Sequence, residues 1–212
     1  MSNNHQPTLA DRAHKVLRSI ADRKATLPVF ALIVIAGVFS RFLLVGEPNF
    51  KPIGALVLFA GFYFSQTRWG VASLLAIMLI SDLFLGFYEP MMMLAVYSSL
   101  MVCFGLGIWC RKLTPANANV SGKTFASFLI SSLGMSCAFF LLTNFAVWSS
   151  GLWYPSTLEG LTQCFAAAIP FFRNTLSSDL LFSQTLLVGY ATTCLVAKTD
   201  WLGLRTPAVA KK

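Results

Sequence analysis

Several runs of about 20 mostly apolar residues divide the sequence, and each is long enough for an α-helix to cross the hydrocarbon core of a membrane. Only 11% of the 212 residues are charged and 56% are hydrophobic, whereas roughly a quarter of the residues of a soluble domain are charged. The sequence therefore predicts an all-α integral membrane protein that folds as one compact domain.

The apolar runs predict six transmembrane helices. The first run is longer than the apolar region of a secretory signal peptide, so we interpret it as a retained span. The second is the shortest and begins near Pro52. The links Thr67-Arg68 and Glu89-Pro90 are tight, so the second to fourth spans are expected to be antiparallel neighbours. The predicted spans are residues 27–46, 50–66, 69–88, 91–110, 124–148 and 174–197.

Lys and Arg residues fall mostly on one side of these predicted spans. Thirteen of the 16 would lie inside, two outside, and Arg41 within a span. Because cytoplasmic loops carry an excess of Lys and Arg, both termini are predicted to be cytoplasmic in a multi-pass protein of a bacterial inner membrane. The net charge of +8 then reflects topology and contact with the lipid bilayer, and binding to nucleic acid is not expected.

Two basic tails flank the predicted transmembrane domain, at residues 1–26 and 199–212, with the six spans inside residues 27–198. Apolar residues between Leu9 and Ile20 fall on one helical face with basic residues opposite. This amphipathic pattern is typical of a helix that lies on an anionic membrane surface. A solvated tail is the other interpretation, and the sequence leaves both open.

The longest outer connection contains a second amphipathic pattern. Ser156 and Glu159 have the spacing of a capping box, and apolar residues then recur along one face as far as Ile169. This predicts a short outer helix over residues 157–169, ended by Pro170. It would be either a lid over a cavity or an interfacial spacer, and we favour the lid because long ordered loops are often functional.

Three ionisable residues are predicted to lie at one depth inside the membrane. Arg41 is five residues before the end of the first span, Asp82 is six before Tyr88, and Asp179 is six after Arg173. At a rise of about 1.5 Å per residue, all three lie roughly 7–9 Å below the outer surface. The inner halves of the spans are mostly apolar or small. The other polar and aromatic residues of the same outer half are Asn49, Asn144, Trp148, Trp153, Tyr154 and Asn174.

A charged side chain in a membrane span costs a few kcal/mol, so it normally faces the bundle interior and has a partner. One interpretation is an interhelical lock, such as an Arg41–Asp82 pair, in a structural or assembly factor that transports nothing. The other is a polar cavity that opens outward and holds a small molecule. The candidate binding residues are Arg41, Asn49, Asp82, Tyr88, Asn144, Trp148, Trp153, Tyr154, Arg173, Asn174 and Asp179.

Several kinds of chemistry are not expected. The two histidines, His5 and His14, are both in the amino-terminal tail, so an intramembrane serine–histidine site or an H-E-x-x-H zinc site is excluded. Neither Asp82 nor Asp179 has the G-x-G-D context of an intramembrane aspartyl protease. Cys164 is the one cysteine predicted on the outer side, where it either packs as a small apolar group or is a weak candidate for a metal ligand. We therefore expect no enzymatic activity and no cofactor.

A series of motifs carries a family resemblance over about residues 28–195. The series resembles a family of small bacterial membrane proteins of undefined function, which is similar to the substrate-binding S-components of energy-coupling-factor vitamin transporters, including the solitary cobalamin transporter. The members of the series are Arg41, NFKPIGALVLFAG (49–61), SDLFLGFY (81–88), TNFAVW (143–148), YPSTLEGLTQC (154–164) and AIPFFRNTLSSDLLF (168–182). The last three of these motifs are the most specific.

This resemblance implies an S-component-like bundle of six helices, a cytoplasmic amino terminus and a pocket near the outer surface for a vitamin-like molecule, cobalamin being one candidate. It also implies an energising ATPase module as a partner. S-components that dock on that module usually show an A-x-x-x-A pattern in the first helix, and the alanines at 31 and 36 have a different spacing. The region around Asp82 and Tyr88 also has no counterpart of the metal-ligating cysteine of the cobalamin transporter.

Overall fold

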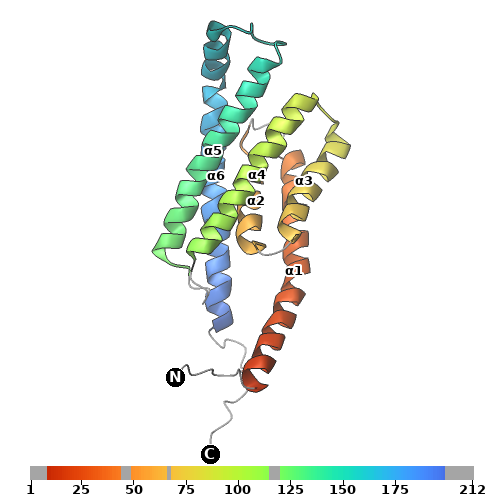
Figure 1. The fold of residues 1–212 in the computed structure, drawn as a ribbon, viewed down its shortest axis with the longest axis vertical. Coiled ribbons are helices and arrows are strands. Elements are labelled where there is room, and N and C mark those ends of the chain that lie inside the picture. The colour runs from red at the N-terminus through yellow and green to blue at the C-terminus, as the bar shows by residue number, and fades with distance from the viewer. Residues whose placement is uncertain (1–8, 44–48, 66–67, 115–119, 199–212) are drawn as a thin grey trace, which may run out of the picture.

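The protein is all-helical wherever the structure describes it. The structure is a computed structural model that describes residues 9–43, 49–65, 68–114 and 120–198, with side chains described from residue 26 to residue 194 of these ranges. The helices run alternately up and down the long axis of the molecule (Figure 1). They are α1 (Leu9–Leu43), α2 (Ile53–Tyr63), α3 (Trp69–Leu85), α4 (Pro90–Leu113), α5 (Gly122–Ser149) and α6 (Leu158–Lys198).

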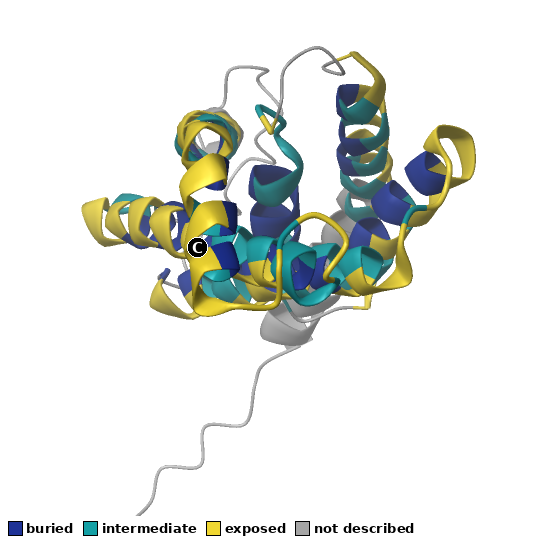
Figure 2. Cartoon of the chain, turned by 90° about the horizontal axis from the view of Figure 1, so that it is seen from above, coloured by how far each residue is buried: buried dark blue, intermediate teal, exposed yellow. Residues whose placement is uncertain are grey.

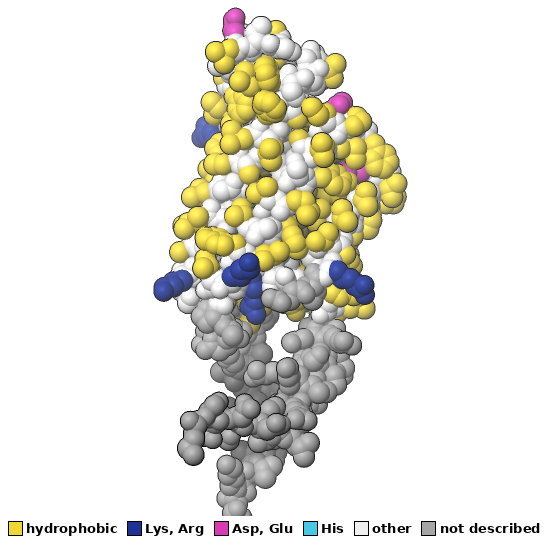
Figure 3. Space-filling view, viewed as in Figure 1, with side chains coloured by type: hydrophobic (Ala, Val, Ile, Leu, Met, Phe, Trp, Pro, Cys, Tyr) yellow, Lys and Arg dark blue, Asp and Glu magenta, His cyan; other side chains and the backbone are white. Residues whose placement is uncertain are grey.

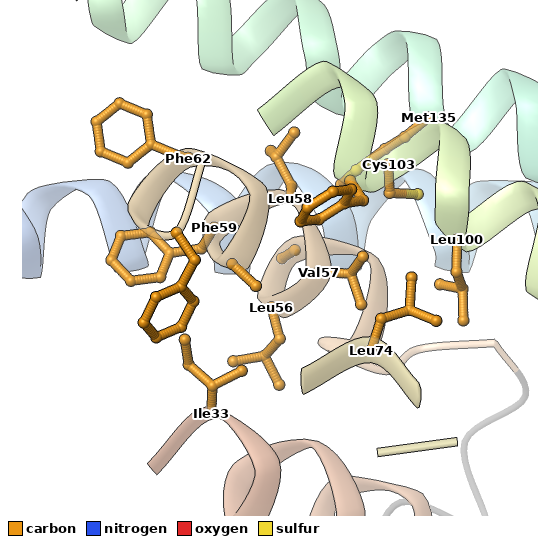
Figure 4. Packing of buried hydrophobic residues seen from close by; sticks show 14 of the residues in the cluster. Ile33, Leu56, Val57, Leu58, Phe59, Phe62, Leu74, Leu100, Cys103 and Met135 are labelled. Atoms are coloured by element: carbon orange, nitrogen blue, oxygen red, sulfur yellow. The ribbon is translucent and has the colours of Figure 1, made fainter. Parts of the chain in front are cut away.

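Helix α2 is the centre of the fold, and it contacts each of the other five helices. Its residues 55–62 are all buried, as expected for a helix that is apolar on every side. Figure 4 shows its side chains pointing in several directions, toward Ile33 of α1, Leu74 of α3, and Leu100 and Met135 of α4 and α5. Seen from above, buried residues lie inside and exposed residues around the periphery (Figure 2).

The outer helices form two groups around α2. Helix α1 packs on α3, while α4 packs on α5 and α5 on α6. The α5–α6 hairpin extends beyond the other helices at the upper end of Figure 1. Because α3 and α4 touch little, α2 and a few polar contacts carry the connection between the two groups.

Two glycines allow the backbones of α2 and α4 to touch. A Cβ atom added to Gly107 of α4 would lie 2.8 Å from the backbone nitrogen of Phe62 and 2.9 Å from the Cα atom of Gly61. A Cβ atom added to Gly61 would overlap the carbonyl oxygen of Phe104. Glycine is therefore needed at both positions because of space, as at close helix crossings in membranes.

Three helices among the described residues are long and apolar enough to cross a membrane: Thr26–Leu43, Pro90–Leu113 and Gly122–Ser149. Large apolar side chains are widely exposed on the bundle, for example Leu32, Phe84 and Leu94, each at least 67% exposed. Figure 3 shows this apolar surface. By length and composition the chain is therefore a membrane protein.

Helix α2 differs from the predicted second span, residues 50–66. It has 11 residues, which at 1.5 Å per residue is about 16 Å, well short of the roughly 30 Å of a bilayer core. The sequence pattern identified its apolar character correctly, but that character reflects burial among other helices.

The prediction of a separate outer helix over residues 157–169 was wrong. These residues form the first turns of α6, a helix of 41 residues that continues through Pro170. A proline inside a helix removes one hydrogen bond and crowds the preceding turn. Here Pro170 and its neighbours Ile169 and Phe171 are all exposed, so the proline ring displaces no neighbouring helix. The predicted start of the sixth span at Asn174 is therefore in the interior of α6.

Helix α1 also continues where the sequence suggested a boundary. It runs without a break from Leu9 to Leu43, so the predicted tail and the first span share one helix. The last three residues of the predicted first span, 44–46, lie outside the described residues. The amphipathic face predicted for residues 9–20 consists of side chains that the structure does not describe. The predicted tail at residues 199–212 also lies outside the described residues.

Candidate functional site

Four helix ends meet in the upper half of the molecule. Helix α1 ends at Leu43, α2 begins at Ile53, α3 ends at Leu85 and α4 begins at Pro90. The α5–α6 hairpin passes alongside them. This arrangement brings polar residues from separate parts of the sequence to one level of the bundle.

An ion pair connects α1 to α3 at this level. Arg41 Nη1 donates to Asp82 Oδ1 at 2.6 Å, and it also lies within hydrogen-bonding distance of Ser81. Tyr97 of α4 donates its hydroxyl to the other carboxylate oxygen, Asp82 Oδ2, at 2.9 Å. Asp82 is fully buried, whereas the side chain of Arg41 is 14% exposed. The network therefore joins three helices, and Asp82 is its acceptor on both sides.

Asp179 forms a second polar centre between α5, α6 and α2. Ser136 of α5 donates to Asp179 Oδ2 at 2.7 Å. Oδ1 faces the first turn of α2, so close that a Cβ atom on Gly54 would lie 2.6 Å from it. The first turn of a helix has free N–H groups and a partial positive charge, which favours a carboxylate there. One residue earlier on α6, Ser178 donates to the carbonyl of Lys51 at 2.7 Å and fixes the segment that precedes α2.

A cavity of about 210 Å³ lies between these two centres. Three of its lining residues are ionisable, namely Arg41, Lys51 and Asp179. Asn49 contributes from a left-handed backbone conformation (φ 58°), which Asn tolerates better than most residues. The rest of the wall is largely apolar. The other lining residues are Ile53, Gly54, Met78, Tyr88, Val96, Leu100, Cys103, Met135, Phe139 and Thr175.

A second cavity, of about 280 Å³, adjoins the first. The two share Asn49, Val96, Phe139 and Thr175 as lining residues. The second cavity lies among α4, α5 and α6, and its wall is mainly aromatic and aliphatic. Its remaining lining residues are Met92, Phe140, Thr143, Asn144, Val147, Ala168, Phe171 and Phe172.

The charges around the first cavity do not balance locally. Arg41 and Lys51 carry charges of the same sign and line the same cavity, and Tyr88 is part of its wall. Among the described residues, Arg41–Asp82 is the one salt bridge, so neither Lys51 nor Asp179 has an ion-pair partner there.

The structure brings five of the eleven predicted binding residues to the cavities. Arg41, Asn49, Tyr88 and Asp179 line the first, and Asn49 and Asn144 line the second. Asp82 lies directly behind Arg41 and lines neither. Asp179 was predicted near the start of a helix but lies in the middle of α6, and it lines the same cavity as Arg41.

The remaining predicted residues lie farther out, where the α5–α6 hairpin turns. Trp148 Nε1 donates to the carbonyl oxygens of Pro155 and Thr157, so it holds the turn. Trp153 is 78% exposed. Tyr154 is half-buried in the same turn. The other two, Arg173 (exposed) and Asn174 (half-buried), are on α6 and line neither cavity.

Cys164, the weak candidate for a metal ligand, is buried, and its thiol donates to the carbonyl of Asn144 at 3.4 Å. The described residues contain no group of three His, Cys, Asp or Glu side chains close enough to hold a metal ion. The thiol packs between α5 and α6, as a small apolar side chain would.

Several residues of the site were not identified from the sequence. Lys51 was counted only as a charge outside the membrane, although its position beside Asn49 was a usable signal. Tyr97 carries a hydroxyl in an apolar span, where a buried phenol needs a partner. Ser136 is a small residue in an apolar span, and its sequence context gives no sign of a polar partner. Met135, Phe139 and Thr175 have no distinguishing pattern.

Comparison with known proteins gives one match. A family model described as a family of unknown function (DUF6580) matches residues 21–200. No curated protein matches the chain, and no solved structure matches it. Since the family match covers most of the 212 residues, the protein belongs to the family of unknown function DUF6580.

Proposed function

We propose that the protein is a membrane component that binds a small polar, vitamin-like molecule from the outer side of a bacterial inner membrane, in the manner of a transporter S-component. The observation that carries the proposal is the cavity between Arg41 and Asp179. Side chains from α1, α6 and the segment before α2 line it together, although more than a hundred residues separate Arg41 from Asp179.

The size and wall of the site support a small ligand. Ligand pockets typically measure about 300–1,000 Å³ and have apolar walls with a few converging polar groups. Each of the two cavities is below that range, at about 210 and 280 Å³, but they adjoin through four shared residues. Together the two cavities have a volume within the range of typical ligand pockets, enough for a small metabolite that occupies both.

The distribution of charge supports an outward-facing site. On the face shown in Figure 3, Lys and Arg gather mostly at the lower end of the described residues, and Asp and Glu lie toward the upper end. The cavities are near the upper helix ends. If the basic end is cytoplasmic, as the positive-inside rule predicts, the cavities are in the outer half of the membrane.

A second candidate function also has a specific observation in its favour. Arg41, Asp82 and Tyr97 form a connected network across α1, α3 and α4, as an interhelical lock would. This favours a structural or assembly factor if the cavities remain empty. We prefer the binding function because the lock explains Asp82 but leaves Lys51 and Asp179 without ion-pair partners among the described residues.

Thr175 lines both cavities, so a bulky side chain there should block them together. We expect Thr175→Trp to reduce the amount of any co-purifying small molecule at least tenfold, while the protein remains folded. The measurement is mass spectrometry of small molecules that elute with the protein in mild detergent.

Thr185→Trp is a matched control on the same helix. Thr175 and Thr185 each donate to the carbonyl four residues earlier, at 3.1 and 2.8 Å, but Thr185 is exposed on the outside of the bundle. The control should retain the molecule at the wild-type level. If the wild type carries no small molecule, or if both variants retain one equally, the binding function is contradicted.

A further inference from the structure

We propose that the ligand of this site is an amino-acid-like zwitterion, with a carboxylate and an ammonium group, that carries a flat aromatic substituent. This inference rests on the proposed binding function and specifies its substrate class. It uses the charges of the first cavity and the aromatic wall of the second.

The first cavity is lined by one basic and one acidic residue that have no ion-pair partner among the described residues. The Arg41 guanidinium is neutralised by Asp82 behind it. Lys51 and Asp179 line the same cavity, and no salt bridge joins them to each other or to any other described residue. Charges in a membrane-embedded cavity are costly without partners. A ligand with both signs of charge satisfies both groups and introduces no net charge.

The carboxylate of the ligand has a defined set of donors. The Arg41 guanidinium contacts Met78, Ser81 and Asp82 through Nη1 alone, so Nε and Nη2 make no hydrogen bond to another described residue. Lys51 lines the same cavity as Arg41, and the two side chains carry charges of the same sign. An anionic group between these two cations would relieve their repulsion and accept hydrogen bonds from both.

The ammonium group of the ligand has one acceptor. Asp179 is 4% exposed, and Ser136 occupies only its Oδ2 atom. Oδ1 has no hydrogen-bond partner among the described residues and lies against the first turn of α2, beside the cavity. A cation there would compensate a carboxylate that is otherwise buried without an opposite full charge.

The aromatic substituent fits the second cavity. Phe139 belongs to both cavities, so a ligand whose charged head is in the first would extend past this ring into the second. Phe140, Phe171 and Phe172 line that part, and Phe140 lies 4.9 Å from Phe172 between ring centroids. A flat ring of the ligand would make stacked or edge contacts with these rings, the arrangements that aromatic groups prefer.

Four probes separate these contributions in one experiment. L-Tryptophan has both charges and a ring, indole-3-propionate lacks the ammonium, tryptamine lacks the carboxylate, and glycine lacks the ring. Binding of tritiated L-tryptophan to the full-length protein in lipid nanodiscs is measured, and the other three compete with it. We expect L-tryptophan to bind at least tenfold more tightly than each of the others.

Two variants test the assignment of each charge. Lys51→Met should weaken binding of L-tryptophan and indole-3-propionate about tenfold and leave tryptamine unchanged. Asp179→Asn, which keeps an oxygen for the Ser136 hydroxyl, should weaken L-tryptophan and tryptamine and leave indole-3-propionate unchanged. If Asp179→Asn does not fold, the Lys51→Met result with all four probes still decides, because Lys51 is half-buried and outside the helices.

The two proposals fail in different ways. If the protein binds none of the four probes but retains a co-purified molecule of another class, the zwitterion is wrong and the binding function stands. Indole-3-propionate or tryptamine binding as tightly as L-tryptophan would also overturn the zwitterion. If the wild type binds no probe and retains no molecule, both proposals are overturned.

Discussion

Gly107→Ala is expected to destabilise the protein by about 3 kcal/mol or more, the upper part of the range for overpacked cores. The added methyl group would meet backbone atoms of α2, namely the Phe62 nitrogen and the Gly61 Cα atom. Backbone atoms cannot rotate away as a side chain can, so α2 and α4 would have to separate. Because α2 contacts every other helix, the change would spread through the core. Thermal unfolding in detergent measures the effect.

Gly105→Ala is the matched control, two residues away on the same helix. A Cβ atom at Gly105 has nothing within 4 Å, so the substitution should be neutral or stabilising by up to about 1 kcal/mol, because alanine favours a helix more than glycine does. If Gly107→Ala destabilises the protein and Gly105→Ala does not, the α2–α4 contact, and not helix propensity, is the cause of the stability loss. Equal effects would contradict the close contact.

The fold could be predicted from the sequence where the local sequence of a helix is enough to determine its structure. Each of the six apolar runs overlaps one helix of the described residues, because a long apolar helix has few alternatives. The apolar runs did not predict features that depend on the packing of neighbouring helices. The 11 residues of α2 are apolar because five helices surround them, and no local pattern distinguishes this from a lipid environment. Pro170 ordinarily ends a helix, but in α6 its surroundings are open and the helix continues.

The site could be predicted in part for a related reason. Charged residues in apolar spans are costly, so Arg41, Asp82 and Asp179 were conspicuous in the sequence. The sequence did not indicate which of the three faces a cavity, since that depends on how α1, α3 and α6 are rotated against α2. Asp82 has both oxygens occupied by Arg41 and Tyr97, whereas Asp179 keeps one toward the cavity. The outer aromatic residues were weaker indicators because Trp and Tyr collect at any membrane interface.

Asp82→Leu is expected to cost about 3–5 kcal/mol of stability, the usual effect of removing one partner of a buried ion pair. The substitution leaves the Arg41 guanidinium without a counter-ion and the Tyr97 hydroxyl without its acceptor. Glu89→Ala is the control: Glu89 is an exposed acid that caps α4 by accepting from the Met92 nitrogen at 2.8 Å, so its loss should cost about 1 kcal/mol. Unfolding midpoints of both variants in the same detergent give the comparison.

A double variant separates the two causes of this loss. If the cost arises from an uncompensated charge, Arg41→Met combined with Asp82→Leu should recover most of the stability, because an apolar pair of similar size can replace a buried ion pair. The double variant should nevertheless lose the ligand, since Arg41 lines the cavity and Asp82 does not. A double variant that is as unstable as the sum of the single changes would contradict the pairing. One that is stable and still binds the ligand would show that the polar network supports only the fold, because the guanidinium would then have no part in recognition.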